Sequence, residues 1–150
     1  IPQFVTEIKE NAFYECKKIR TVQFSNNSKL QMICDNTFAC SSIEKFTIPS
    51  NTIEIGKSSF FFCSKLKKID FQPNSKLKKI GYEAFQNSSI TCFSVPPSVV
   101  QIDRYAFACK NFKIIEFDKN SKIESIHHEL FEYNSPLLVM IPMELISIIK

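Results

Sequence analysis

Six cysteines are the side chains in this sequence whose type and spacing could support redox or metal chemistry. Four of them follow a phenylalanine by two or three residues, at Cys16, Cys40, Cys63 and Cys109. Such a series could hold buried thiols that pack as small apolar side chains, disulfides between neighbours, or metal ligands. We expect one inward cysteine per repeat, buried as a thiol. No Cys-x-x-Cys spacing supports a zinc site.

The remaining candidates for chemistry are sparse. His127 and His128 are adjacent, so their side chains should point apart in an exposed turn, and the repeat pattern places no nucleophile or carboxylate of another turn next to them. Two glycines in the whole chain leave no room for a glycine-rich phosphate loop. The sequence therefore predicts no enzyme, no cofactor and no metal. Asn26 and Asn87 begin Asn-x-Ser sequons, and Asn26 is the better candidate for glycosylation if the parent protein is secreted.

The elements that must carry these residues form a repeat marked by phenylalanine. The gaps between successive markers are 25, 22, 25, 22 and 24 residues, and an isoleucine stands five positions before each marker. The markers are Phe13, Phe38, Phe60, Phe85, Phe107 and Phe131. A period of 20–29 residues is typical of a solenoid, because one repeat cannot bury its apolar face without its neighbours.

A second apolar triplet follows each marker, with spacings of three and then two residues. Its members are Ile19-Val22-Phe24, Ile43-Phe46-Ile48, Leu66-Ile69-Phe71, Ile90-Phe93-Val95, Phe112-Ile115-Phe117 and a degenerate Pro136-Val139-Ile141. The alternation at the end of each triplet predicts a strand, and strands that recur once per repeat should pair in parallel. Polar residues with alanine just before the marker predict a short helical turn.

The loops after these strands alternate between a longer and a shorter class. Ser28-Lys29-Leu30 recurs as Ser75-Lys76-Leu77 and Ser121-Lys122-Ile123, which indicates duplication of a two-repeat unit. We expect residues 1–150 to form a single array. Ile1-Pro2 matches the Ile-Pro that ends internal repeats, so this array is expected to be a fragment of a longer one.

The recurrent pattern of isoleucine, alanine-phenylalanine, cysteine and a following apolar strand resembles the BspA-like leucine-rich repeat family. One copy reads Val5, Ile8, Ala12-Phe13, Cys16, Ile19, Val22 and Phe24. The resemblance implies a leucine-rich-repeat solenoid of about six stacked 22–25-residue repeats. It also implies a parallel β-sheet on the concave face, short strands and helical turns elsewhere, and a role in recognition, since many members are surface proteins that bind host proteins or cells.

Composition narrows the partners of such an array. The net charge of +4 is spread along the chain and does not predict a nucleic-acid partner. No stretch reaches the roughly 18 apolar residues of a membrane span, so we expect no direct membrane insertion by this segment. A protein ligand is the expected partner.

The predicted binding residues are the outward side chains of the strands on the concave face. They are Arg20, Thr21, Gln23, Glu44, Lys45, Thr47, Lys67, Lys68, Asp70, Ser94, Lys113, Ile114 and Glu116. Thr91 and Cys92 share this face, which turns apolar at Leu137, Leu138 and Met140. Such an apolar end indicates either contact with a next repeat, which we favour, or a binding site. We expect a protein-binding module of a cell-surface or secreted adhesin or receptor. The alternative is a cytoplasmic scaffold or substrate-recognition module in a larger assembly.

Overall fold

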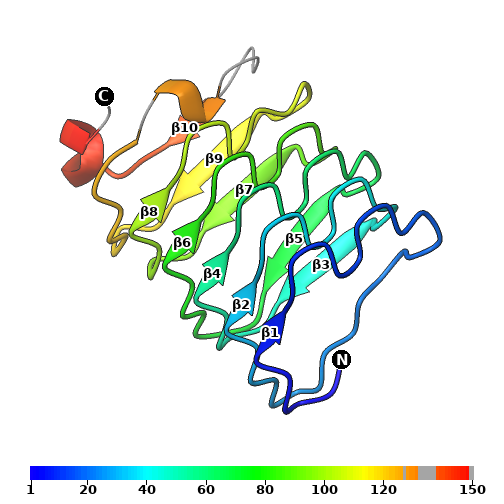
Figure 1. The fold of residues 1–150 in the computed structure, drawn as a ribbon. Helices are drawn as coiled ribbons and strands as arrows, with labels where there is room; N and C mark the ends of the chain where they lie inside the picture. The colour runs from blue at the N-terminus through cyan, green and yellow to red at the C-terminus, as the bar shows by residue number, and fades with distance from the viewer. Residues whose placement is uncertain (127, 132–137, 149–150) are drawn as a thin grey trace.

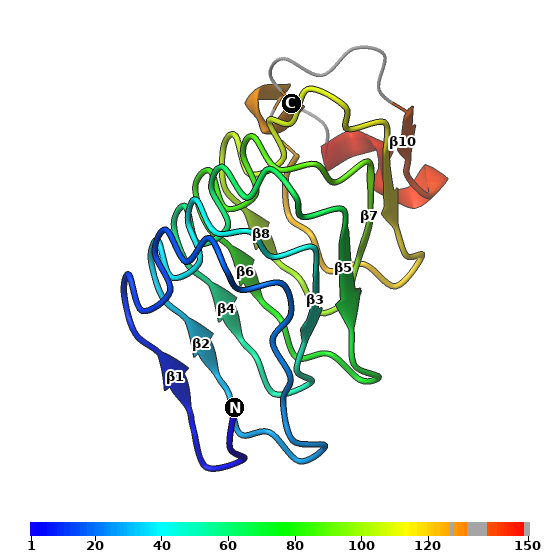
Figure 2. The same cartoon turned by 90° about the vertical axis from the view of Figure 1, so that its right-hand side faces the viewer.

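The chain winds into a solenoid in which successive turns stack side by side (Figure 1). A computed structural model describes residues 1–126, 128–131 and 138–148. Nearly every turn contributes one very short strand and one longer strand, and these form two rows on opposite sides of the core (Figure 2). Within the described ranges, no helix is long and apolar enough to cross a membrane.

The short strands form one continuous parallel sheet of two-residue elements. They are β1 (Glu7–Ile8), β2 (Met32–Ile33), β4 (Glu54–Ile55), β6 (Lys79–Ile80) and β8 (Gln101–Ile102), paired in that order. The isoleucine of every strand points inward and is buried. These buried isoleucines are the ones that stand five residues before each of the first five phenylalanine markers.

The longer strands follow the second apolar triplet and confirm the predicted parallel pairing. They are β3 (Lys45–Ile48), β5 (Lys68–Phe71), β7 (Cys92–Val95), β9 (Ile114–Phe117) and β10 (Leu138–Met140). β3 pairs with β5, and β7, β9 and β10 form a second sheet. No ladder joins β5 to β7, so the expected single sheet is divided in two. Residues 19–24 of the first repeat form no strand, although the Arg20 carbonyl accepts a hydrogen bond from Glu44 N–H at 2.9 Å.

The segments around the first five markers are successive tight turns, so the predicted helical turn is wrong there. Within the first turn Ala12 N–H donates to the Lys9 carbonyl at 3.1 Å, whereas Phe13 N–H donates to the Thr37 carbonyl of the next repeat at 2.7 Å. Left-handed residues lie two positions before and after the first four markers, as at Asn11 and Glu15. Alternate N–H groups therefore bond along the turn and across to the next rung. In the sixth repeat the segment is a 3-10 helix, η1 (His128–Phe131), and a second one, η2 (Met143–Ile148), follows β10.

Stacked phenylalanine rings fill the centre of the core. Phe13, Phe38, Phe60, Phe85 and Phe107 stack face to face, with centroid separations of 5.1, 5.2, 5.3 and 5.5 Å along the series. The side chain of the sixth marker, Phe131, lies outside the described residues. Offset ring stacking adds about 0.5–1.5 kcal/mol per pair beyond the burial of apolar area, so this column makes neighbouring turns cohere.

Close stacking of the turns explains the two glycines. A Cβ on Gly56 would lie 2.6 Å from Asp35 Oδ1 and 2.8 Å from the backbone carbonyl carbon of Cys34. One on Gly81 would lie 2.7 Å from the backbone of Gly56 and of Lys57. Both positions need glycine because the backbone of the preceding turn occupies the space of a side chain.

The cysteine series is real, but it is not a contiguous ladder. The Sγ of Cys63 lies 3.4 Å from the Oγ of Ser41, and that of Cys109 lies 3.3 Å from the Oγ of Ser88. The column therefore reads Cys16, Ser41, Cys63, Ser88 and Cys109, and Ser88, not Asn87, represents the fourth repeat. Cys40, which sequence spacing placed in the column, sits beside it with a φ of 58° and is only partly buried.

This alternation settles the redox question for the column. All six cysteines are thiols in the structure, with Cys63 and Cys109 buried. A serine rung separates successive column cysteines, and two steps of about 4.8 Å exceed the roughly 7 Å limit between bridged Cα atoms. The column therefore cannot be closed by disulfides between Cys16, Cys63 and Cys109.

The three longer loops share one hydrogen bond. In each, a serine Oγ accepts a hydrogen bond of 3.3 Å from the backbone N–H two residues later. The donor N–H groups belong to Leu30, Leu77 and Ile123, and the acceptors are Ser28, Ser75 and Ser121. The same local bond at matching positions is the structural counterpart of the two-repeat period. Serine is favoured there because its hydroxyl substitutes for a backbone acceptor in a turn.

Candidate protein-binding face

The long-strand face consists of the outward side chains of β3, β5, β7, β9 and β10 together with those of residues 20–23. Of the thirteen residues predicted for binding, eleven are exposed, and Asp70 and Ile114 are partly exposed. Cys92 is exposed in register with Ile114, as the strand period predicts. Parallel strands in register align the alternate side chains of β3 with those of β5 and the alternate side chains of β7 with those of β9. Arg20, Thr21 and Gln23 lie outside any strand, and Arg20 is joined to this face by its ion pair with Glu44. The role of all thirteen in binding stays a prediction.

Charges on the long-strand face are only partly compensated. Arg20 pairs with Glu44 at 3.6 Å across the first two turns, and Lys68 pairs with Asp70 at 2.9 Å within β5. These pairs are exposed and contribute about 0–1 kcal/mol each. The face also carries Lys45, Lys67 and Lys113, none of which forms an ion pair with a described residue. Its middle therefore presents a positive field with scattered carboxylates.

The N-terminal end of the long-strand face contains a shallow pocket of about 420 Å³. Its walls include the outward side chains of Thr21, Gln23, Lys45 and Thr47. Phe24 and Val22 line it as well and are half-buried. The sequence predicted both as core residues, but in the structure they are partly exposed, like the other apolar residues of the first turn.

A larger open groove of about 930 Å³ lies at the carboxyl ends of the strands, toward the C-terminal end of the face. Phe71, Pro96, Pro97, Ile141 and Pro142 supply apolar wall. Glu116 and Asp118 bring carboxylates to it. Of the residues that line the groove, Ser94 and Glu116 were among the predicted binding residues. Phe71 and the prolines were interpreted as core and turn residues, and the Pro-Pro pair was the signal that could have indicated an apolar loop.

The apolar end predicted for the face is present where the structure describes it. Leu138 is 55% and Met140 49% exposed on β10. Leu137 lies outside the described residues. Exposed aliphatic side chains next to the groove extend its apolar surface.

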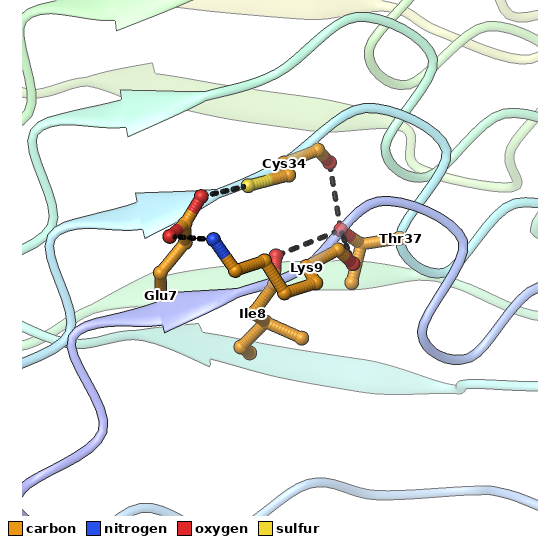
Figure 3. Close-up of polar contacts among 5 residues, drawn as sticks. All are labelled: Glu7, Ile8, Lys9, Cys34 and Thr37. Atoms are coloured by element: carbon orange, nitrogen blue, oxygen red, sulfur yellow. Dashed lines mark hydrogen bonds and ion pairs between the residues drawn. The ribbon is translucent and has the colours of Figure 1, made fainter.

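A cluster of polar contacts on the short-strand sheet surrounds Cys34 and determines whether its thiol is reactive (Figure 3). Cys34 Sγ donates to Glu7 Oε1 at 3.0 Å, and Lys9 Nζ donates to the other oxygen of the same carboxylate. Thr37 Oγ1 donates to the Cys34 carbonyl at 2.7 Å. Burial, reinforced by the hydrogen bond to Glu7, raises the pKa of Cys34 to about 11.

A thiol with this pKa is a poor nucleophile at neutral pH, because the thiolate is the reactive form. The same hydrogen bond from Cys34, with that from Lys9, lowers the pKa of Glu7. The cluster is therefore a structural tie between the first two turns. Among the described residues no group of three His, Cys, Asp or Glu side chains could hold a metal ion. His127 lies outside the described residues, and His128 lies in η1.

Comparison with known proteins places the repeat. The model of the BspA-type leucine-rich repeat region matches residues 1–76 and 31–150, with six copies. The comparison with curated proteins gives no match.

Solved structures of bacterial repeat proteins share the fold. The pneumococcal vaccine antigen PcpA is 31% identical with a TM-score of 0.78, over 83% of this chain and 31% of PcpA. A leucine-rich repeat protein from Bacteroides ovatus is 25% identical with a TM-score of 0.71, over 92% of this chain and 41% of its own. A leucine-rich cell surface protein from Faecalibacterium prausnitzii shares the fold at 23% identity and a TM-score of 0.57, over 83% and 38%.

The chain thus spans less than half of each of these three structures. The six matched copies and the stacked parallel turns agree on the architecture. This chain belongs to the BspA-type leucine-rich repeat family.

Proposed function

We propose that this array is the protein-binding part of a cell-surface or secreted adhesin or receptor, and that it binds through the long-strand face. The observation that carries the proposal is the alignment of unpaired lysines and exposed polar side chains in neighbouring rows on one regular surface. Leucine-rich repeats are typically non-enzymatic scaffolds that bind proteins. Solenoids offer extended surfaces of this kind because each turn adds one row.

Two relatives support the surface location. One is named as a vaccine antigen and another as a cell surface protein. A cytoplasmic scaffold is the second candidate, and the free cysteines fit either location, because the spacing of the cysteine column prevents disulfides between its members in any compartment. Protease treatment of intact cells separates the two, since only a surface protein is cleaved.

The test of the binding face is a quadruple Lys→Ser variant at Lys45, Lys67, Lys68 and Lys113. Adhesion to cells and to matrix proteins is measured at low and high salt. We expect weaker binding and a flatter salt response, because exposed charges act on encounter rate and salt dependence. A matched variant removes four exposed lysines elsewhere, at Lys29, Lys78, Lys110 and Lys122. Equal binding by both variants and the parent chain refutes the proposal.

A further inference from the structure

We propose that the groove at the carboxyl ends of β5, β7, β9 and β10 binds an extended peptide segment that carries alternating apolar and cationic side chains. The inference rests on the proposed function, that this array binds protein. It adds the groove as a place of contact and states the chemistry of the partner segment that would bind there. Cationic here means Lys or Arg on the partner. The groove meets the long-strand face at Ser94, Glu116 and Met140.

The first observation is the division of the longer strands. Between residues 67–72 and 91–96 no backbone hydrogen bond is present, whereas β3–β5 and β7–β9–β10 are regularly paired. Phe71 at the end of β5 is only partly buried as a result, although the equivalent Ile48 is fully buried. The break thus opens an aromatic side chain of the core to the groove.

The second observation is the charge of the groove. No Lys, Arg or His is among the described residues that line it, in a chain of net charge +4. Of the three carboxylates on the long-strand face, Glu44 and Asp70 are neutralised by Arg20 and Lys68. Glu116 instead accepts a hydrogen bond from Ser94 Oγ at 2.9 Å.

Asp118, the second carboxylate of the groove, is also held by a neutral donor. Its Oδ1 accepts from the Asn120 N–H at 2.7 Å. Neutral donors orient both carboxylates and leave their charge in place. A cation from a partner is therefore the missing complement, and it would meet two carboxylates on neighbouring loop and strand positions.

The third observation is the shape and lining of the groove. Strand spacing of about 4.8 Å makes the distance from β7 to β10 roughly 10 Å, and the groove continues beyond this across the unpaired step to Phe71 of β5, so it is long enough for at least three extended residues. Apolar surface from Phe71, Pro97, Ile141 and Pro142 lines the same groove. An extended segment directs alternate side chains to opposite sides, so one set can contact this apolar surface while the other set meets the rim that carries Glu116. Aromatic or aliphatic anchors supply most affinity in such interfaces.

The test uses the full chain and a fluorescein-labelled hexapeptide of alternating Val and Lys, titrated by fluorescence anisotropy. Control peptides alternate Val with Glu and Ser with Lys. We expect the Val-Lys peptide to bind, and both controls to bind at least about tenfold more weakly, because each control lacks one complement. Binding of the Val-Glu peptide as tight as that of the Val-Lys peptide, or no binding of any peptide, overturns the proposal.

Variants locate the site. The double variant Glu116→Gln/Asp118→Asn should weaken the Val-Lys peptide by about fivefold, since two exposed charge pairs are lost. The matched variant Glu10→Gln/Glu15→Gln makes the same charge change on exposed residues of the first turn and should bind like the parent chain. Met140→Ser should weaken binding without changing its salt dependence. Equal affinities for the two double variants count against the groove.

Amide chemical shifts give a readout that does not depend on a variant. Shifts caused by the Val-Lys peptide should cluster around residues 71–75, 94–97, 116–118 and 139–142. Shifts confined to the short-strand sheet or the turns overturn the proposal. The quadruple Lys→Ser variant should keep this peptide binding while its adhesion weakens, so the groove and the long-strand face can fail separately.

Discussion

Removal of the ring in the middle of the phenylalanine stack, by Phe60→Ala, should cost about 3–5 kcal/mol in the free energy of unfolding. Phe60 is fully buried. It stacks on Phe38 at 5.2 Å and on Phe85 at 5.3 Å, and Phe46 meets it edge-on at 5.0 Å. No end of the array lies close enough to collapse into the resulting cavity.

The comparison that gives this prediction its force is Phe13→Ala. Phe13 is half-buried and has one ring partner among the described residues, Phe38 at 5.1 Å. With two fewer ring pairs and less buried area we expect a cost of about 1–2 kcal/mol. Phe60→Leu, which keeps apolar volume, should fall between the parent chain and Phe60→Ala.

Urea denaturation followed by circular dichroism measures the three variants. A repeat array can lose all-or-none unfolding when its middle is weakened, so hydrogen exchange of the β4 and β6 amides should accompany the melts. Equal costs for Phe13→Ala and Phe60→Ala would refute the stacked-core reasoning, since the position in the stack would then not matter.

Three further outcomes follow from buried polar and thiol groups. Ser59→Ala should stabilise the chain by about 1 kcal/mol in urea melts, because the fully buried Ser59 Oγ has no hydrogen-bond partner among the described residues. Alanine already occupies the equivalent position in two other turns, at Ala84 and Ala106. A loss of stability would contradict this reasoning. A maleimide should label Cys92 first and Cys63 and Cys109 last in the native chain, as read by mass spectrometry, because only Cys92 is exposed and burial raises the pKa of the other two. Burial raises the pKa of Cys63 from 9.0 to about 11, so the neutral buried thiol contributes stability that is fully present below pH 9 and is lost as pH rises through 11. Cys63→Ser should therefore lessen the alkaline fall in the free energy of unfolding by up to about 2 kcal/mol, measured by urea melts across this pH range. Identical pH profiles for the variant and the parent chain would exclude this cause.

The repeat, the inward isoleucine and phenylalanine columns and the longer strands could be predicted from spacing alone. They depend on apolar periodicity, which neighbouring copies reinforce. The turns could not be predicted, since they place residues as different as Asn36, Cys40 and Phe62 in the left-handed region. Asparagine tolerates that conformation, but cysteine and phenylalanine give no such signal. The bonds to adjacent rungs compensate for the strain.

The candidate site was predictable in its direction but not in its extent. Strand alternation predicted which side chains face outward, from Arg20 to Glu116. The break between β5 and β7 depends on how two particular turns pack against each other. Nothing in the sequence around Phe71 indicates it. Likewise the sequence predicted Cys40 as a member of the cysteine column, which is off by one residue. Cys40 has a left-handed backbone conformation, and the next residue, Ser41, points inward in its place.

The most direct test of binding through the long-strand face uses its own exposed thiol. Cys92 is modified with a polyethylene glycol maleimide, single labelling is verified by mass spectrometry, and adhesion is measured. A control chain, Cys92→Ser/Lys110→Cys, carries the same label away from the face. The proposed function predicts that the polymer on Cys92 abolishes adhesion and that the polymer at position 110 does not. Adhesion by the Cys92-labelled chain equal to that of the unlabelled chain would contradict it.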